Sequence, residues 1–174
     1  MTMKLRSLKS FAIFLIAICA HIHWAMAQNS NKNSLNIPCA ATKDIKAPQL
    51  YGMWQVTFTN PPSGLPPNAA MLLKKHEEFS DSLQGVVTRK LPSTQSANGK
   101  NGHAEKAALA GDVEDGFVIL DESSNNISIS GTWNGQLVSG TCGREVTGLW
   151  KDTSASAVPD APDVPFVLKK LSGW

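Results

Sequence analysis

Histidines and carboxylates are the side chains of this sequence best suited to acid–base or metal chemistry. After residue 27 the histidines are His76, which precedes Glu77 and Glu78, and His103, which follows a glycine. Neither has a further ligand at the short spacing typical of zinc sites. The pattern therefore predicts solvated side chains and no metal or other cofactor.

Several carboxylates cluster around one predicted hairpin, namely Asp112, Glu114, Asp115, Asp121 and Glu122. Paired carboxylates catalyse acid–base reactions only at a defined separation across a sugar or a water. Carboxylates near turns are ordinarily solvated. The chain has no Gly-x-Ser-x-Gly elbow, Walker A loop, His-Glu-x-x-His helix or Cys-x-x-Cys pair. We therefore expect no catalytic residues and no enzyme.

The first 27 residues have the features of a secretory signal peptide. Lys4, Arg6 and Lys9 precede the apolar run 11–20, and Ala25-Met26-Ala27 is a small-x-small cleavage site before Gln28. Ten apolar residues are too few to span a membrane as a helix. We expect cleavage between Ala27 and Gln28, a periplasmic or secreted protein, and no membrane span after processing.

Removal of this leader changes the charge balance of the chain. The full sequence has 16 Lys and Arg against 14 Asp and Glu, and three of the basic residues lie in the leader. The processed chain then has a net charge of −1 and no basic stripe. Nucleic-acid binding needs such a stripe and is not expected.

Two cysteines remain after processing, Cys39 and Cys142, and Cys19 is lost with the leader. In an oxidising compartment two such thiols form a disulfide by default. The alternative, a thiolate nucleophile or a metal ligand, needs a histidine nearby or a second thiol at short spacing, and neither is present. The sequence therefore predicts a Cys39–Cys142 disulfide.

From residue 50 onward the sequence alternates apolar and polar residues, as Trp54, Val56 and Phe58 do with the residues between them. This period of two is typical of strands with one buried face. The strands that we expect are 50–59, 69–79, 83–89, 104–113, 117–122, 126–133, 136–142, 145–151 and 166–171.

Residues 104–110 also have helix propensity, but the Asp115-Gly116 turn signal that follows favours a strand. Asn134-Gly135 is a second hairpin signal, which predicts a turn between 126–133 and 136–142. In the first of these runs Ile127 and Ile129 share a face with Trp133.

The domains that we expect are a leader (1–27), a tail or strap (28–48) and a β domain (49–174). Short strands joined by tight turns indicate an all-β, antiparallel up-and-down barrel of about eight strands, with a β-sandwich as the alternative. The disulfide would hold the strap to the barrel.

A glycine stands two residues before a tryptophan in three predicted strands, at Gly52/Trp54, Gly131/Trp133 and Gly148/Trp150. Residues two apart in a strand point to the same face, so each pair sets an empty position beside the largest side chain. Such glycines let a strand bend and make room for a neighbouring ring. The indoles would either fill the barrel or line a cavity in it.

The Gly52-Met53-Trp54 stretch in the first strand, the run of hairpins and the basic pair Lys169-Lys170 in the last strand resemble the calycin superfamily, which includes lipocalins and avidins. The resemblance implies that Trp54 closes one end of the barrel and that Lys170 packs across its indole, where the family usually has arginine. The residues of avidin-type biotin sites have no match here. The resemblance covers residues 50–174 in architecture and few residues in motif.

We therefore expect an exported, non-enzymatic binding module with a small hydrophobic or amphipathic ligand in its barrel. The residues that we expect to line the site are Trp54, Phe58, Trp133, Trp150 and Lys170. A protein-interaction or protease-inhibitor domain, acting through the 28–48 tail or the 91–103 and 152–165 loops, is the alternative, and bacterial periplasmic metalloprotease inhibitors are small barrels of similar design. An uncharacterised enzyme is a third possibility. An outer-membrane barrel is disfavoured by short strands and a single tyrosine.

Overall fold

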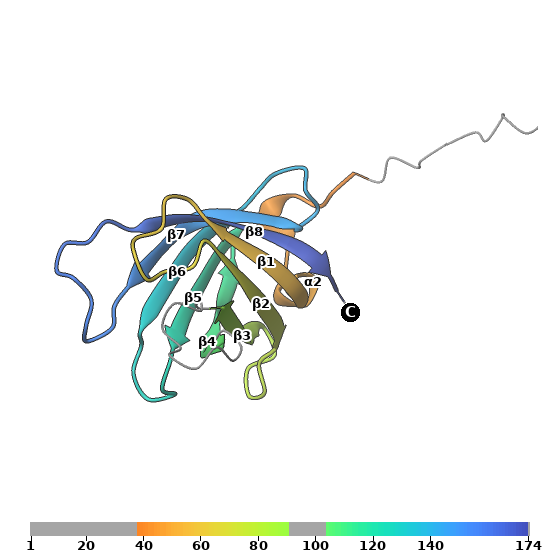
Figure 1. Ribbon diagram of the computed structural model, residues 1–174. Coiled ribbons are helices and arrows are strands. Elements are labelled where there is room, and N and C mark those ends of the chain that lie inside the picture. The colour runs from red at the N-terminus through yellow and green to blue at the C-terminus, as the bar shows by residue number, and fades with distance from the viewer. Residues whose placement is uncertain (1–37, 91–103, 174) are drawn as a thin grey trace, which may run out of the picture. The chain divides into compact units, whose positions relative to one another are not determined.

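Eight antiparallel strands form a closed barrel in the computed structural model, which describes residues 38–90 and 104–173 (Figure 1). Each strand pairs with the next in the chain, and β8 pairs with β1 to close the sheet. The predicted all-β up-and-down barrel is confirmed. The strands are β1 (Gly52–Phe58), β2 (Asn68–Lys75), β3 (Ser82–Lys90), β4 (Ala104–Glu114), β5 (Phe117–Ser123), β6 (Gly131–Leu137), β7 (Glu145–Asp152) and β8 (Val164–Ser172).

Alternating side chains of each strand point into the barrel and form its core. β1 shows the pattern most clearly, because Trp54, Val56 and Phe58 are buried and the residues between them are exposed. Residues of β4 with helix propensity form a strand, as predicted, since β3 and β5 pair with β4 on its two edges. Tertiary pairing therefore overrides local propensity here.

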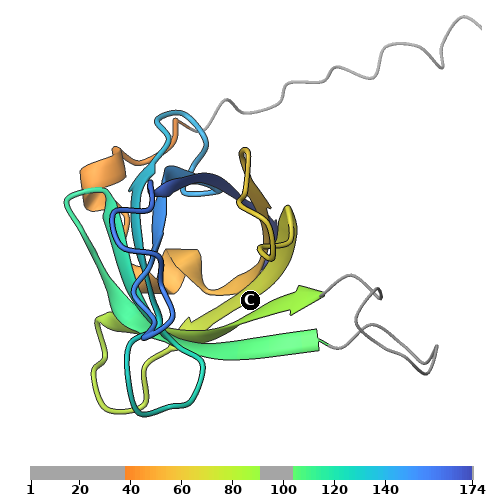
Figure 2. The ribbon, with the colours of Figure 1, turned by 60° about the vertical axis from the view of Figure 1, so that its left-hand side comes forward.

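A short segment before β1 packs against the barrel. It contains the 3₁₀ helix η1 (Thr42–Asp44) and the single-turn helix α2 (Ala47–Leu50). Ile45, Ala47 and Leu50 are buried in the same core as the strands. In Figure 2 the orange segment that contains α2 lies across the ring of strands. The first part of the predicted tail, residues 28–37, lies outside the described residues.

The prediction of a hairpin turn at Asn134-Gly135 is wrong. Both residues lie inside β6, where Asn134 pairs with Ile119 and Leu149, and Gly135 pairs with Val118 and Gly148. Neither has a positive φ. Ladders on both sides of β6 outweigh the local turn preference, and the chain reverses later, in residues 138–144. The predicted strand 136–142 therefore does not form beyond Leu137.

The predicted strand 126–133 is also wrong in its first half. β6 begins only at Gly131, and the preceding residues form a loop in which Ile127 is 90 % exposed. Asn125 stabilises this loop by accepting hydrogen bonds from the backbone N–H groups of Ile127 and Ser128, each at 2.9 Å. Hydrogen bonds from the backbone to the Asn125 side chain thus replace the strand pairing that the alternation of Ile127 and Ile129 had suggested.

The turn predicted at Asp115-Gly116 is present between β4 and β5, and both residues have positive φ, 50° and 86°. Because the strands run up and down, the connections lie at alternate ends of the barrel. The β1–β2, β5–β6 and β7–β8 loops share one end, which we call the mouth. The β2–β3, β4–β5 and β6–β7 connections share the other end with α2, which we call the capped end.

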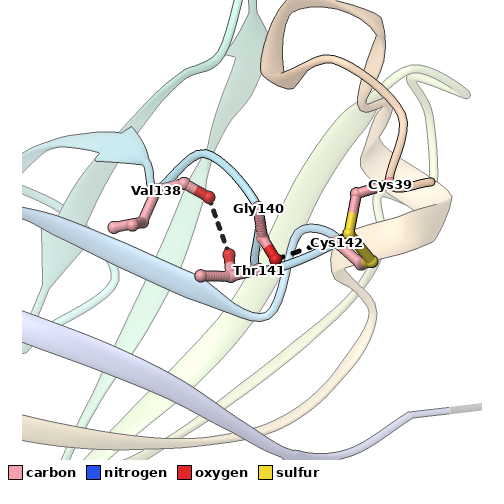
Figure 3. Close-up of a disulfide and its surroundings, with 5 residues drawn as sticks. All are labelled: Cys39, Val138, Gly140, Thr141 and Cys142. Atoms are coloured by element: carbon pink, nitrogen blue, oxygen red, sulfur yellow. Dashed lines mark hydrogen bonds between the residues drawn. A yellow bond between two sulfur atoms is a disulfide. The ribbon is translucent and has the colours of Figure 1, made fainter. Parts of the chain in front are cut away.

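The predicted disulfide between Cys39 and Cys142 joins the segment before β1 to the β6–β7 connection (Figure 3). The Cα atoms are 4.7 Å apart and the two residues are 103 positions apart in the chain. In the same connection the Thr141 hydroxyl donates a 2.8 Å hydrogen bond to the Val138 carbonyl (Figure 3). The disulfide therefore fastens the cap to the barrel.

Replacing both Cys39 and Cys142 by serine should lower the free energy of unfolding by about 2–5 kcal/mol, because the unfolded chain loses a loop closure of this length. Urea unfolding of the chain without residues 1–27 measures the change. As a control, the double variant should match the wild type under a reducing agent. A structural role of the disulfide would be contradicted if the double variant were as stable as the oxidised wild type and the reducing agent did not destabilise the wild type.

Candidate functional site

The five residues predicted to line a site fall into two groups at different levels of the barrel. Trp54 and Lys170 lie together at the capped end. Phe58, Trp133 and Trp150 contact one another nearer the mouth. All four aromatic residues are buried, and Lys170 is half-buried. The structure therefore does not bring the five together into one lining.

The capped end is a packed closure. Lys170 Nζ lies 5.8 Å from the centroid of the Trp54 ring and donates a 2.7 Å hydrogen bond to the Gln49 carbonyl of α2. Trp54 Nε1 donates to the Leu50 carbonyl at 2.9 Å. Burial, and secondarily the charge of Arg144, lowers the pKa of Lys170. These contacts tie α2 across the end of the barrel, and the predicted contact of Lys170 with the Trp54 indole is present.

The aromatic rings nearer the mouth pack against one another. The Trp133 centroid lies 5.6 Å from that of Phe58, 6.3 Å from that of Trp150 and 5.0 Å from that of Phe166. These are the distances of tilted and edge-to-face ring pairs in protein cores. The rings therefore fill this level of the barrel, and any open space lies above them, at the mouth.

A buried ion pair lies on top of these rings. Arg89 of β3 donates two hydrogen bonds to the Glu122 carboxylate of β5, from Nη1 to Oε1 at 2.6 Å and from Nη2 to Oε2 at 2.7 Å. The residues are only 4 % and 3 % exposed. A bidentate, charge-assisted pair of this geometry is among the strongest polar contacts in proteins. Because the pair is buried, removing either residue would leave the other charge without compensation.

Both indoles of the aromatic cluster hold the same carboxylate. Glu122 Oε2 also accepts hydrogen bonds from Trp133 Nε1 at 3.0 Å and Trp150 Nε1 at 3.2 Å. The Arg89 guanidinium carbon lies 5.8 Å and 5.4 Å from the two indole centroids, which places the cation over both rings. Glu122 thus accepts four hydrogen bonds. Its carboxylate fixes the orientation of both indoles.

The glycine before each of these tryptophans makes the arrangement possible. A Cβ at Gly131 would lie 2.7 Å from Trp150 Nε1, so only glycine leaves the indole room to reach Glu122. A Cβ at Gly148 would lie 2.1 Å from the Asn134 carbonyl oxygen and so would separate β6 from β7. The predicted role of glycine, room for a neighbouring indole, is seen directly at Gly131.

Arg89 retains donor capacity that Glu122 does not use. A guanidinium has five N–H groups, and Glu122 accepts from two of them. Within residues 38–90 and 104–173, the buried Arg89 Nε has no hydrogen-bond partner. A buried donor without an acceptor costs about 1–3 kcal/mol, so an oxygen brought to this side of the guanidinium would be stabilised.

A pocket of about 360 Å³ opens above the ion pair at the mouth of the barrel. Arg89, Glu122 and Trp150 contribute to its wall from the strands. The β1–β2, β5–β6 and β7–β8 loops supply most of the rest, together with Glu105 of β4. The remaining lining residues are Pro62, Ser63, Gly64, Leu65, Ser124, Ser130, Asp152, Ser154 and Ser156.

Arg89 and Glu122 are the site residues that sequence reasoning missed. Glu122 was expected to be solvated with its acidic neighbours, and it is buried, whereas the other four carboxylates of that cluster are not. The available signal was the strand period, because Arg89 follows Val87 and Glu122 follows Leu120 on the buried face. Two opposite charges at inward-facing positions near the ends of two strands indicate a buried ion pair.

The other predicted candidates do not add to this site. His76 accepts hydrogen bonds from the backbone N–H groups of Glu78 and Phe79 at 3.2 and 3.3 Å and so stabilises the β2–β3 turn. His103 and the whole of the predicted 91–103 loop lie outside the described residues. No group of three potential metal ligands occurs in residues 38–90 and 104–173. In the same residues, none of the helices combines the length and hydropathy needed to cross a membrane.

Glu122→Gln should lower the free energy of unfolding by about 3–5 kcal/mol, because it leaves the buried Arg89 cation without a counter-charge. Glu145→Gln is the matched control, since Glu145 pairs with Lys169 at 3.9 Å on the surface, and should cost at most about 1 kcal/mol. Chemical denaturation of the two variants measures both values.

Adding Arg89→Met to Glu122→Gln should recover part of the loss, because the cation is removed and the carbonyl oxygen of the introduced amide can still accept from the indoles. Equal costs for Glu122→Gln and Glu145→Gln would show that the pair does not stabilise the barrel.

Known proteins give no further guide to the site. No protein-family model matches this chain, and no curated protein matches it. The candidate site therefore rests on the geometry of its own residues: a buried arginine–glutamate pair, held by two indoles, at the base of an open pocket.

Proposed function

We propose that this protein is an exported, non-enzymatic binding module of the calycin type, which holds one small amphipathic ligand in the mouth of its barrel. The observation that carries the proposal is the Arg89–Glu122 pair beneath the pocket of about 360 Å³, with an unused Arg89 donor. Small-molecule sites have volumes of roughly 300–1,000 Å³ and combine apolar walls with a few placed polar groups.

The aromatic packing favours the mouth over the barrel interior as the binding position. Phe58, Trp133 and Phe166 are in ring contact inside the barrel below the mouth, so a ligand between them would have to displace a packed core. At the mouth, Leu65 and the edge of Trp150, which is 7 % exposed, offer apolar contact beside polar groups. An amphipathic ligand matches this combination better than a wholly apolar one.

The state of Glu122 favours binding over catalysis. Its two oxygens accept four hydrogen bonds, two from a guanidinium and two from indoles. A general base needs a lone pair directed at the substrate proton and freedom to take that proton. A carboxylate engaged in this way instead serves to orient Arg89 and the tryptophans.

Export is supported by two independent features. Residues 1–27 have the composition of a signal peptide, and the Cys39–Cys142 disulfide is typical of proteins outside the reducing cytosol. The calycin assignment is supported by the closed eight-stranded barrel and by Lys170 packed over Trp54.

Blocking the mouth should abolish binding of a neutral amphipathic dye, N-phenyl-1-naphthylamine, to the chain without residues 1–27. Ser124 lines the pocket, so Ser124→Trp should weaken dye binding by about tenfold or more, equivalent to about 1.4 kcal/mol. Asn134→Trp adds the same side chain at an exposed position of the outer wall and should bind as the wild type does. Dye fluorescence titrations give the affinities.

Equal binding by the wild type, Ser124→Trp and Asn134→Trp would place the dye elsewhere and contradict the proposal. So would the absence of any dye binding.

A further inference from the structure

The charges and donors around the pocket also define the ligand's polar group. Resting on the proposed function, we infer that the mouth selects a neutral, oxygen-bearing head group, such as a sugar or another polyol, and rejects carboxylates. The inference concerns chemical class and depends on three features of the described lining residues: their net charge, the unused Arg89 donor and the hydroxyl groups of the rim.

The described lining of the pocket is acidic. Arg89 and Glu122 neutralise each other, and Glu105 and Asp152 add two carboxylates that are exposed at the rim. In the strand register, Glu105 of β4 lies opposite Arg89 of β3. Gly131 of β6 lies opposite both Glu122 of β5 and Asp152 of β7. Glu105 therefore lies on the strand between those that carry the ion pair, and Asp152 lies two strands beyond Glu122. An anionic head group here would face like charges at the rim.

The unused donor disfavours a cationic head group. Arg89 Nε is buried and has no acceptor in the described part of the chain, so a ligand oxygen that reaches this nitrogen is stabilised by it. An ammonium group is attracted by the rim carboxylates but has no acceptor to offer to Arg89. An uncharged hydroxyl or carbonyl oxygen supplies that acceptor without repulsion from the rim.

The rim can complete the recognition of such a group. Five serines line the pocket, and their hydroxyl groups both donate and accept. The hydroxyl oxygens of Ser154 and Ser156 lie 3.1 Å apart. The Ser130 hydroxyl accepts a 3.0 Å hydrogen bond from the Ser124 backbone N–H. Hydroxyl-rich surroundings next to the Trp150 edge suit an oxygen-rich head group with an apolar tail.

Three probes with straight alkyl tails of seven or eight carbons test the inference: octyl glucoside, octanoate and octylamine, below their micelle concentrations at about pH 7.5, where the two ionisable probes are charged. Each competes with N-phenyl-1-naphthylamine for the chain without residues 1–27. Octyl glucoside should displace the dye at a concentration at least about tenfold lower than either charged probe. If octanoate or octylamine displaces the dye equally well or better, the head-group inference is overturned and the binding site stands.

Removing the rim charges gives a matched second arm. Glu105→Gln with Asp152→Asn should strengthen octanoate binding several-fold at low salt, and less at high salt, with little effect on octyl glucoside. Glu114→Gln with Asp121→Asn makes the same change in net charge at exposed positions outside the pocket and should leave all three affinities unchanged. Equal effects of the two double variants would overturn the electrostatic argument.

The outcomes separate the inference from the function on which it rests. Dye that binds at the mouth and is displaced by none of the three probes would overturn the head-group inference alone. A chain that binds neither the dye nor any octyl probe, by fluorescence and by calorimetry, would overturn both.

Discussion

Burial of the Glu122 carboxylate inside the barrel is the constraint on which the site depends. A carboxylate removed from water needs a cation and enough donors to satisfy both oxygens. Arg89 supplies the cation from β3, and Trp133 and Trp150 supply donors from β6 and β7. Four strands must therefore hold their register for one charge to be tolerated. Closure of the barrel by β1 and β8 completes the wall around it.

Two of the three glycine–tryptophan pairs serve the same constraint, but their glycines act differently. Gly131 leaves space for the Trp150 indole to reach Glu122, whereas Gly148 lets the backbones of β6 and β7 approach. One tryptophan therefore relies on a glycine of the neighbouring strand. The third pair belongs to the capped end, where Trp54 contacts Lys170 and bonds to Leu50. A repeated motif thus serves structure at one end and the site at the other.

Much of the fold could be predicted from the sequence, because a period of two and tight-turn residues are local signals. The barrel, the turn at Asp115-Gly116 and the disulfide follow from such signals and are present. The turn predicted at Asn134-Gly135 is wrong because β5 and β7, which pair with the two edges of β6, decide its conformation. Local turn preference carries no information about those partners.

The candidate site was less predictable than the fold. The inward tryptophans could be predicted, but Glu122 looked like a solvated acid at a turn. Its partner Arg89 lies 33 residues earlier in the chain. Only the register of β3, β4 and β5 brings the two together. The polar character of the mouth, which favours the amphipathic over the hydrophobic ligand in the proposed function, follows from that pairing.

Nitrogen-15 NMR of the chain without residues 1–27 tests most directly whether Arg89 forms the base of a ligand site. That chain has only two arginines, Arg89 and Arg144, and four tryptophans, Trp54, Trp133, Trp150 and Trp174. On titration with octyl glucoside, we expect the Arg89 Nε–H signal and the Trp150 indole signal to shift together and saturably. The signals of Arg144 and Trp54, near the capped end, should stay in place. Saturable binding that shifts Trp54 and leaves Arg89 unchanged would contradict a site at the mouth.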